Sequence, residues 1–224
     1  MIFAAGLGRR MAPLTDRLPK PLIPVAGRPL IDHAISLLRD AGIERIVVNT
    51  HYLAPLLEAH LAGTGVETIH EPERLETGGG LRKALPLLGP GPVLTLNSDA
   101  VWRGENPVKA LLRHWEPERM EALVSVSDRV LGHAGAGDFL ADEAGRLRRG
   151  PGLIYLGAQI LNPARLADVA EPVFSLNRVW DGMIADGGLY GLRYDGDWCD
   201  VGRPASIPLA EAMLAEDRAR AEDV

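Results

Sequence analysis

The sequence predicts an α/β fold in which helices cover both faces of a Rossmann-like, mostly parallel sheet. Three observations predict it. Short apolar runs alternate with segments of helical periodicity. The links between them are short, which is typical of strand–helix–strand units. Polar or glycine-rich segments at residues 6–10, 71–80 and 97–99 follow the predicted strands. Because ligands of such sheets bind beyond the carboxyl ends of the strands, we expect these three segments to meet in one crevice.

The first half is predicted to alternate strands with helices. Apolar residues recur at helical spacing from Leu30 to Ala41, and Gly42 is a natural stop for that helix. Pro107 suits the start of another helix, whereas Pro86 weakens the last turn of a third. The expected helices cover residues 30–41, 53–61, 81–88 and 108–115. The expected strands cover residues 1–3, 43–48, 66–69, 93–96 and 123–126, and residues 71–80 are expected to form a loop.

The second half has a mixed pattern, which suits a small subregion packed on the same sheet. Its expected elements are a hairpin of residues 138–140 and 147–149, a strand over 154–161, a helix over 175–185, a hairpin of residues 189–194 and 198–201, and a closing helix over 204–221. Neither a repeat nor a linker divides the chain. We therefore expect a single domain over residues 1–224, with halves at 1–127 and 128–224.

The charge distribution points to a local anion site in an otherwise acidic chain. The formal net charge is −6, from 24 basic and 30 acidic side chains. Residues 1–28 nevertheless contain five basic residues and one acidic residue, a local charge of +4; these are Arg9, Arg10, Arg17, Lys20 and Arg28 against Asp16. Such a balance does not indicate a nucleic-acid-binding protein. The alternative to phosphate binding is a solvated surface side chain, which we expect for Arg17 and Arg9.

Composition also argues against a membrane or disulfide-stabilised protein. No apolar stretch approaches the ~20 residues that span a bilayer, and no signal-peptide pattern is present. The single cysteine, Cys199, excludes an internal disulfide framework and fits a reducing cytoplasm. Because residues 1–3 form so short a first strand, we expect the natural start of the protein to lie upstream of Met1.

The segment from Ala4 to Met11 (Ala-Ala-Gly-Leu-Gly-Arg-Arg-Met) has the composition of a polyphosphate-binding loop. Glycines let backbone N–H groups approach an anion closely, because no Cβ stands in the way. Arg9 and Arg10 lie in the loop and Lys20 follows twelve residues after Gly8, so cations that can neutralise a triphosphate are at hand. We therefore expect a polyphosphorylated ligand here.

Two carboxylates stand at the ends of apolar strands. Asp99 ends the run Leu96-Asn97-Ser98-Asp99, and Asp200 lies in Trp198-Cys199-Asp200-Val201-Gly202. Magnesium prefers a few carboxylates together with phosphate oxygens and water, so this pair predicts an Mg²⁺ site beside the loop. The alternative for each aspartate alone is a helix cap or a turn former.

The segment Glu71–Gly80 predicts a nucleobase contact. Three successive glycines, Gly78–Gly80, lose much backbone entropy on folding and suit a place where a ligand lies flat against the main chain. The alternative is a mobile surface loop. A dinucleotide-binding fingerprint is not supported, because Met11 replaces its third glycine, and no Walker-type G-x-x-x-x-G-K-[ST] motif is present.

Taken together, the motifs resemble those of sugar-1-phosphate nucleotidyltransferases. The resemblance rests on residues 4–11, Pro13-Leu14-Thr15, Pro19-Lys20-Pro21-Leu22, residues 25–31, Leu75–Gly80, Leu96–Asp99 and Trp198–Gly202. It implies an enzyme of glycosyltransferase-A-like fold that binds a nucleoside triphosphate and a sugar 1-phosphate and uses Mg²⁺. The implied halves are a nucleotide-binding half at 1–127 and a sugar-phosphate-binding half with the C-terminal helix at 128–224.

The resemblance also implies roles for individual residues. Arg10 and Lys20 are the implied catalytic residues, and Asp99 and Asp200 the implied metal ligands. The implied nucleotide-binding residues are Ala5, Gly6, Gly8, Arg9, Arg10, Glu71, Glu76, Thr77 and Gly78. The implied sugar-phosphate-binding residues are Asn97, Gly137 and Asp138.

Within the family, the compact length and the Glu-Thr-Gly-Gly-Gly and Trp-Cys-Asp-Val-Gly segments favour uridylyl transfer from UTP to N-acetylmuramate 1-phosphate, a step of peptidoglycan recycling. Guanylyl transfer to mannose 1-phosphate or another hexose-1-phosphate nucleotidyltransferase is the alternative, and a non-catalytic sugar-nucleotide sensor is a third hypothesis. The acceptor half lacks the acidic-lysine-proline segment of many relatives. Candidates for holding the acceptor's lactyl carboxylate are Arg149, Arg178 and Arg193.

Overall fold

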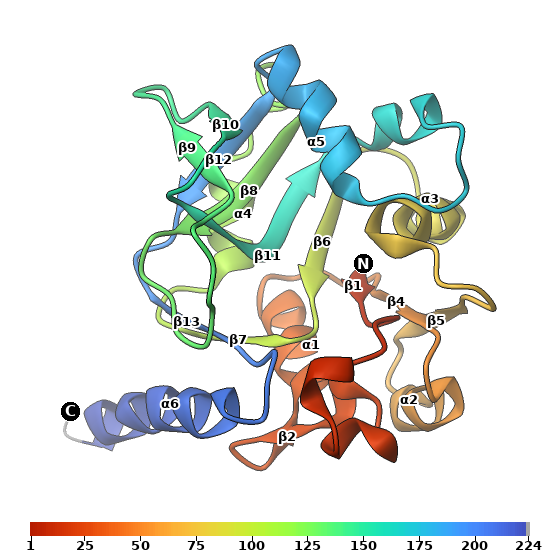
Figure 1. The fold of residues 1–224 in the computed structure, drawn as a ribbon, viewed down its shortest axis with the longest axis vertical. Coiled ribbons are helices and arrows are strands. Elements are labelled where there is room, and N and C mark those ends of the chain that lie inside the picture. The colour runs from red at the N-terminus through yellow and green to blue at the C-terminus, as the bar shows by residue number, and fades with distance from the viewer. Residues whose placement is uncertain (223–224) are drawn as a thin grey trace.

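A seven-stranded sheet forms the centre of the molecule (Figure 1). The computed structural model describes residues 1–222. The strand order is β12-β8-β11-β6-β1-β4-β5, and every neighbouring pair is parallel except those of β11, which runs antiparallel to β6 and β8. The predicted mostly parallel sheet is confirmed. Its strands are β1 (Ile2–Phe3), β4 (Val47–Thr50), β5 (Glu67–His70), β6 (Val93–Asn97), β8 (Ala122–Ser127), β11 (Ile154–Leu161) and β12 (Leu189–Arg193).

Helices cover both faces of this sheet, as predicted. The helices are α1 (Leu30–Asp40), α2 (Ala54–Leu61), α3 (Glu76–Leu88), α4 (Pro107–His114), α5 (Leu176–Ala185) and α6 (Ser206–Glu222). Successive strand residues point to opposite faces, so Val47 packs with α3 and α5 in one apolar cluster while Val48 packs with α1, α2 and α4 in another. Among the described helices, none combines the length and apolar character needed to cross a bilayer.

Local sequence explains where several helices begin. Asn106 precedes α4, and its side-chain oxygen accepts a hydrogen bond of 2.9 Å from the Val108 N–H. Pro107 then occupies the first helical position, where its missing N–H has no cost. Ser175 caps α5 in the same way through the Asn177 N–H. The predicted starts of these helices are correct to within a residue.

Smaller elements surround the sheet. The strand pairs are β2 (Pro24–Val25) with β3 (Arg28–Pro29), β7 (Ala100–Arg103) with β13 (Asp197–Asp200), and β9 (Phe139–Ala141) with β10 (Leu147–Arg149). The β9–β10 hairpin is the one predicted at 138–140 and 147–149. Short 3₁₀ turns occur at Arg9–Met11, Leu14–Asp16, Lys20–Leu22 and Pro163–Asp168.

The predicted hairpin of residues 189–194 and 198–201 is wrong. Strand β12 instead pairs in parallel with β8, and β13 pairs antiparallel with β7. The aromatic residues explain the difference, because the ring of Trp102 lies 5.0 Å from that of Tyr194 and 6.3 Å from that of Trp198. The β7–β13 register sets Asp200 opposite Ala100, immediately after Asp99. This long-range pairing brings the two aspartates to one place.

The glycine run is not a loop either. Helix α3 begins at Glu76, and Gly78–Gly80 are buried in its first turns. A Cβ on Gly78 would lie 2.3 Å from the Phe174 ring, and one on Gly79 would lie 2.3 Å from the carbonyl oxygen of Pro172. Glycine is therefore required here, because the backbone of the helix lies in close contact with residues 172–174. The strand predicted from residue 43 begins later, since β4 covers Val47–Thr50 and residues 43–46 lie outside it.

We predict that Gly78→Ala destabilises the fold by about 1–3 kcal/mol, because the new methyl group overlaps a buried ring and a backbone carbonyl. Urea unfolding followed by circular dichroism measures the loss. Gly6→Ala is the control, since a Cβ there meets nothing within 4 Å. Equal stability of the two variants would contradict the packing role.

Candidate active site

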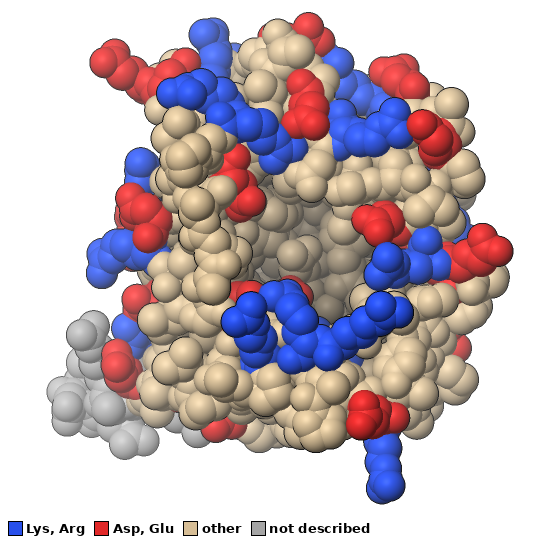
Figure 2. Space-filling view, viewed as in Figure 1, with Lys and Arg blue, Asp and Glu red and all other residues tan. Residues whose placement is uncertain are grey.

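A cavity of about 260 Å³ lies where the carboxyl ends of β1, β4 and β6 meet the loop that leads into α3. Figure 2 shows a hollow on this face, with Lys and Arg side chains along one edge and acidic side chains behind them. All three segments predicted to converge contribute to the lining. The lining residues are Phe3, Ala4, Ala5, Gly6, Lys20, Pro21, Asn49, Glu71, Arg74, Glu76, Thr77, Asn97, Ser98 and Asp99.

The N-terminal loop is held in shape by Gly8. This residue is left-handed (φ 62°), and a Cβ on it would lie 2.8 Å from the Thr15 side chain and 3.1 Å from Lys20 Cβ. The Thr15 hydroxyl donates a 3.0 Å hydrogen bond to the Gly8 carbonyl. Gly8 thus lets the loop fold tightly around Thr15 and Lys20, while Gly6 faces open space at the cavity.

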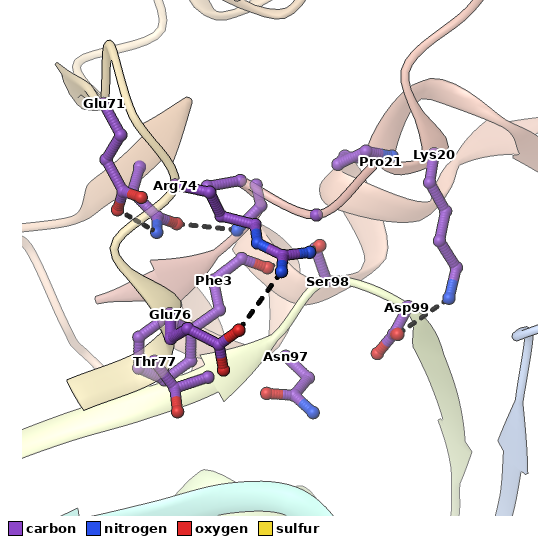
Figure 3. Close-up of a pocket in the computed structure, with 14 residues that line it drawn as sticks. Phe3, Lys20, Pro21, Glu71, Arg74, Glu76, Thr77, Asn97, Ser98 and Asp99 are labelled. Carbon is purple, nitrogen blue, oxygen red and sulfur yellow. Dashed lines mark hydrogen bonds and ion pairs between the residues drawn. The ribbon is translucent and has the colours of Figure 1, made fainter. Parts of the chain in front are cut away.

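Lys20, the first residue of the Lys20–Leu22 turn, lines the cavity. Its Nζ lies 2.7 Å from Oδ2 of Asp99, and both side chains are largely buried, at 12% and 33% exposed. Figure 3 shows this pair at one end of the cavity. The contact satisfies the lysine in the free protein, and it links the cation of the loop to the carboxylate after β6.

Asp200 lies close enough to this pair for their charges to affect it. Burial raises the pKa of its carboxyl group, and the negative charge of Asp99 raises it further. The positive charges of Lys20 and Arg10 lower the pKa of Asp200. Two mutually repelling carboxylates at one point are a donor set that a divalent cation would stabilise.

The backbone holds the two aspartates together. The Val201 N–H donates a 2.8 Å hydrogen bond to the Asp99 carbonyl, so the segments after β6 and β13 are joined directly. A Cβ on Gly202 would lie 2.8 Å from the Asp200 carboxylate and 3.1 Å from the Arg10 guanidinium. Within residues 1–222, no group of three or more His, Cys, Asp or Glu side chains could hold a metal. Two carboxylates fit Mg²⁺ that takes its other ligands from phosphate and water.

Glu71 is buried at the cavity, and both oxygens of its carboxylate already accept hydrogen bonds within the protein. It is 1% exposed; Oε1 accepts a 2.7 Å hydrogen bond from Asn49, and Oε2 accepts one of 3.0 Å from the Leu75 N–H. The Asn49 oxygen in turn accepts a 2.7 Å bond from the Ala4 N–H. Sequence reasoning missed Asn49, although an amide at the end of an apolar strand was the available signal.

Glu76 and Thr77 line the cavity from the first turn of α3, and Gly78 does not. The N–H groups of Gly78 and Gly79 both donate to the Phe174 carbonyl, at 2.9 and 3.1 Å. The amide of Gly78 is therefore engaged in the fold, which corrects the expectation that the glycine peptides face a base. Arg74, which sequence reasoning also missed, lies 3.2 Å from Oε1 of Glu76 (Figure 3).

A second cavity of about 220 Å³ adjoins the first and shares Phe3, Thr77 and Asn97 with it. It extends toward the second half of the chain, where Asp138, Tyr155, Gln159, Ser175, Leu176, Asn177 and Trp180 line it. The Asp138 carboxylate accepts a 2.9 Å hydrogen bond from the Tyr155 N–H. Gly137 lies outside both cavities and packs against Gly152, where a Cβ would approach within 2.4 Å.

The three candidate arginines of the acceptor half lie in different places. Arg149 hydrogen-bonds Asn177 at 2.9 Å and lies over the ring of Trp180, so it contacts two residues of the second cavity. It is also paired with Asp181 at 2.8 Å. Arg178 pairs with Glu171 and Arg193 with Asp128, and neither lines the two cavities.

The predicted residues therefore fall into groups. Those at the main cavity are Ala5, Gly6, Lys20, Glu71, Glu76, Thr77, Asn97 and Asp99, while Asp138 lines the second cavity. Gly8, Arg10 and Asp200 lie next to that lining without forming it. Arg9 and Arg10 are exposed, and their guanidinium groups form no ion pair within the described chain. Gly78 and Gly137 have packing roles.

Known proteins resemble this chain over most of its length. A family model described as MobA-like NTP transferase domain matches residues 1–178. The N-acetylmuramate alpha-1-phosphate uridylyltransferase of Caulobacter vibrioides is 41% identical to this chain, over 96% of this chain and 96% of the relative. That of Neisseria meningitidis is 35% identical, over 95% of this chain and 96% of the relative. The mannose-1-phosphate guanylyltransferase catalytic subunit beta of Drosophila pseudoobscura pseudoobscura is 31% identical over 91% of this chain but only 59% of its own length.

Solved structures show the same fold. A putative glucose-1-phosphate thymidylyltransferase from Bacillus anthracis superposes with a TM-score of 0.80 over 96% of this chain and 94% of its own, at 18% sequence identity. The predicted glycosyltransferase-A-like nucleotidyltransferase architecture is confirmed at the level of the fold.

We predict that Asn49→Ala destabilises the protein by ~2–3 kcal/mol, because the Ala4 N–H and the Glu71 carboxylate each lose a buried partner. The free energy of unfolding in urea measures this. The control is Asn162→Ala, which removes an exposed cap of the Pro163–Asp168 turn and should cost less, about 1 kcal/mol. If both variants lose the same small amount, Asn49 does not hold the strand ends together.

Proposed function

Because the chain belongs to the family of MobA-like NTP transferase domains, we propose that it transfers a uridylyl group from UTP to N-acetylmuramate 1-phosphate. It is a sugar-1-phosphate nucleotidyltransferase. The observation that supports this most is the convergence of Lys20, Asp99 and the Ala4–Gly6 backbone on one cavity, with Arg10 and Asp200 beside it. Similarity to the two uridylyltransferases over nearly the full length of all three chains supports the substrates.

The reaction forms one P–O bond and breaks another. An oxygen of the sugar 1-phosphate attacks the α-phosphorus of UTP in line, and pyrophosphate leaves with the electrons of the cleaved bond. The nucleophile is already an anion, so no side chain has to remove a proton. Catalysis then depends on positioning and on charge stabilisation.

The basic loop would bind the triphosphate. The exposed guanidinium of Arg10 and the backbone N–H groups of Gly6, Gly8 and Arg9 would hold the departing β- and γ-phosphates. Lys20 would leave Asp99 and neutralise charge at the α-phosphate or on the incoming phosphate. The travel is short, because the lysine already lies at the edge of the cavity.

Asp99 and Asp200 would hold Mg²⁺, in keeping with the carboxylate pair described above. The ion supplies neutralisation of charge on the reacting phosphates. Glu71 would act from below as a positioning residue, since its carboxylate is already bonded to Asn49 and Leu75. Glu76 and Thr77 would face the nucleotide from α3.

The second cavity would accept the sugar. Asn97 lies in both cavities and Asp138 in the second, so these two side chains would lie along the acceptor, whereas Gly137 would act by shaping the segment before Asp138. Among the three arginines, Arg149 is the candidate for the lactyl carboxylate, because its guanidinium contacts Asn177 and Trp180 of this cavity, whereas those of Arg178 and Arg193 pair with Glu171 and Asp128. Residues 1–127 would thus bind the nucleotide and 128–224 the sugar phosphate.

Two other functions fit the site less well. A mannose-1-phosphate guanylyltransferase remains the alternative, but this chain matches only 59% of the length of such a relative. A non-catalytic sensor is disfavoured because Arg10, Lys20, Asp99 and Asp200 are all present around one cavity. The proposed product belongs to peptidoglycan recycling in the cytoplasm, where a buried, unpaired thiol such as Cys199 stays reduced.

The test is a panel of four nucleoside triphosphates against several sugar 1-phosphates, scored by pyrophosphate release. We expect UTP with N-acetylmuramate 1-phosphate to be turned over fastest, well above UTP with N-acetylglucosamine 1-phosphate. A site that binds the lactyl carboxylate discriminates strongly against acceptors that lack this group. GTP with mannose 1-phosphate as the best pair would contradict the choice of substrates.

We predict that Lys20→Ala lowers kcat/KM by ~10²-fold or more, the effect of losing one preorganised charge contact. Because Lys20 lowers the pKa of Asp200, the variant should also shift the acid limb of its pH–rate profile to higher pH. Steady-state kinetics across pH measures both. Arg17→Ala, a change at an exposed residue outside the cavity, should leave kcat/KM near that of the wild type. Near-normal turnover by Lys20→Ala would remove the lysine from the mechanism.

A further inference from the structure

We infer that His133 donates a hydrogen bond to the phosphate of the sugar 1-phosphate and so positions the attacking oxygen beside Asp200. The inference rests on the proposed function and adds an acceptor-binding residue to it. Three observations carry it: an imidazole without a partner, a backbone segment fixed against Asp200, and the course of that segment from Asp200 to the second cavity.

The imidazole of His133 differs from those of the other histidines. The chain has six histidines, and five of them place a ring nitrogen in a hydrogen bond: His33, His51, His60, His70 and His114. Within the described chain the ring of His133 has no hydrogen bond or ion pair, and the residue is exposed. The fold therefore does not use this side chain, and its N–H donor is free for a ligand.

Two backbone hydrogen bonds fix the segment before His133 against β13. The Asp200 N–H donates a 2.9 Å bond to the Leu131 carbonyl, and the Leu131 N–H donates one of 3.0 Å to the Trp198 carbonyl. Gly132 follows in the left-handed region (φ 72°), and a Cβ on it would lie 2.3 Å from the Asp200 carbonyl oxygen. Only glycine permits so close an approach. The next residue, His133, lies close enough for a charge on its imidazole to act on the Asp200 carboxyl group.

A second glycine leaves space for the ring. A Cβ on Gly135 would lie 2.6 Å from Nε2 of His133, so any other residue there would displace the imidazole. A solvated surface histidine needs no such space. Gly132 and Gly135 thus both favour the observed place of His133 near Asp200, although the ring makes no contact that stabilises the fold.

The segment connects the Asp200 site to the second cavity. Figure 1 shows it in green, between β8 and β9, extending to β13. Three residues after Gly135 the chain reaches Asp138, which lines the second cavity. In the proposed function the sugar occupies this cavity and its phosphate reacts beside Asp99 and Asp200. The phosphate of the acceptor is therefore the part of the substrates nearest this segment.

The charges explain why that phosphate needs a donor from this side. The one charged side chain that lines the second cavity is the carboxylate of Asp138. Lys20 and Arg10 lie on the side of the triphosphate in the proposed function. A phosphate monoester carries about −1.5 to −2 charges at pH 7 and accepts strong hydrogen bonds. The imidazole of His133 offers an N–H in either protonation state.

The experiment compares His133→Ala with the wild type by calorimetry. UTP with Mg²⁺, without a sugar phosphate, should bind both proteins equally, because UTP lacks the acceptor phosphate. The product UDP-N-acetylmuramate contains that phosphate and should bind the variant about 10- to 100-fold more weakly, the scale of one hydrogen bond to a charged group. At saturating UTP, kcat/KM for N-acetylmuramate 1-phosphate should fall by a similar factor. The Tm should not change, since the ring has no partner in the fold.

A second variant and a control separate a lost donor from a disturbed segment. His133→Gln keeps an N–H donor near the position of Nε2 and should recover part of the product affinity. The matched control is Arg129→Ala, which removes an exposed cation from the same segment. Arg129 lines neither cavity and is not among the groups that act on Asp200, so product binding should equal that of the wild type.

Equal product affinity of His133→Ala and the wild type would overturn the inference. A loss in His133→Ala that His133→Gln does not reduce would also overturn it, because the segment and not the donor would then be responsible. Failure of the proposed function gives a different result: the wild type itself does not bind UDP-N-acetylmuramate and releases no pyrophosphate from UTP with N-acetylmuramate 1-phosphate.

Discussion

The site depends on one buried side chain, Asn49, which ties together three separate segments. Its oxygen accepts from the Ala4 N–H just beyond β1, and its nitrogen donates to Glu71 beyond β5. Glu71 then accepts from the Leu75 N–H immediately before α3. The Asn49 and Glu71 side chains are buried, at 3% and 1% exposed, so the loss of Asn49 leaves the Ala4 N–H and one carboxylate oxygen of Glu71 without this partner. The position of the N-terminal loop relative to α3, and hence the width of the cavity between them, follows from this chain of contacts.

Glycine has two distinct roles around this site. Gly8 is required for its backbone angle, because only a left-handed turn brings the loop around Thr15 and Lys20. Gly78 and Gly79 have ordinary helical angles and are required for close packing on residues 172–174. Glu76, at the start of this helix, has a left-handed backbone (φ 63°), and its side chain lines the cavity. One side of the start of α3 thus packs against residues 172–174, and Glu76 on the same turn lines the cavity.

A charged ligand would change the partners of the charged side chains at the site. Asp99 is paired with Lys20, and Asp200 has a raised pKa because it is buried beside Asp99. The unpaired guanidinium of Arg10 lies near both. A polyphosphate accompanied by a divalent cation would satisfy all four side chains at once, since the anion neutralises the lysine and arginine and the cation neutralises the carboxylates. Without a ligand these side chains partly neutralise one another, and a ligand would replace those contacts with its own.

By itself the sequence determined the fold class, the basic loop, the two aspartates and the family resemblance, because each is written in local periodicity or in a short motif. Tertiary structure decided the rest. Whether β13 pairs with β12 or β7 depends on the contacts of Trp102 with Tyr194 and Trp198, both of which are far from it in the chain. The helical state of Gly78–Gly80 and the burial of Glu71 depend on Phe174 and Asn49. Local propensity favours a loop for a glycine run, and only long-range packing overrides it.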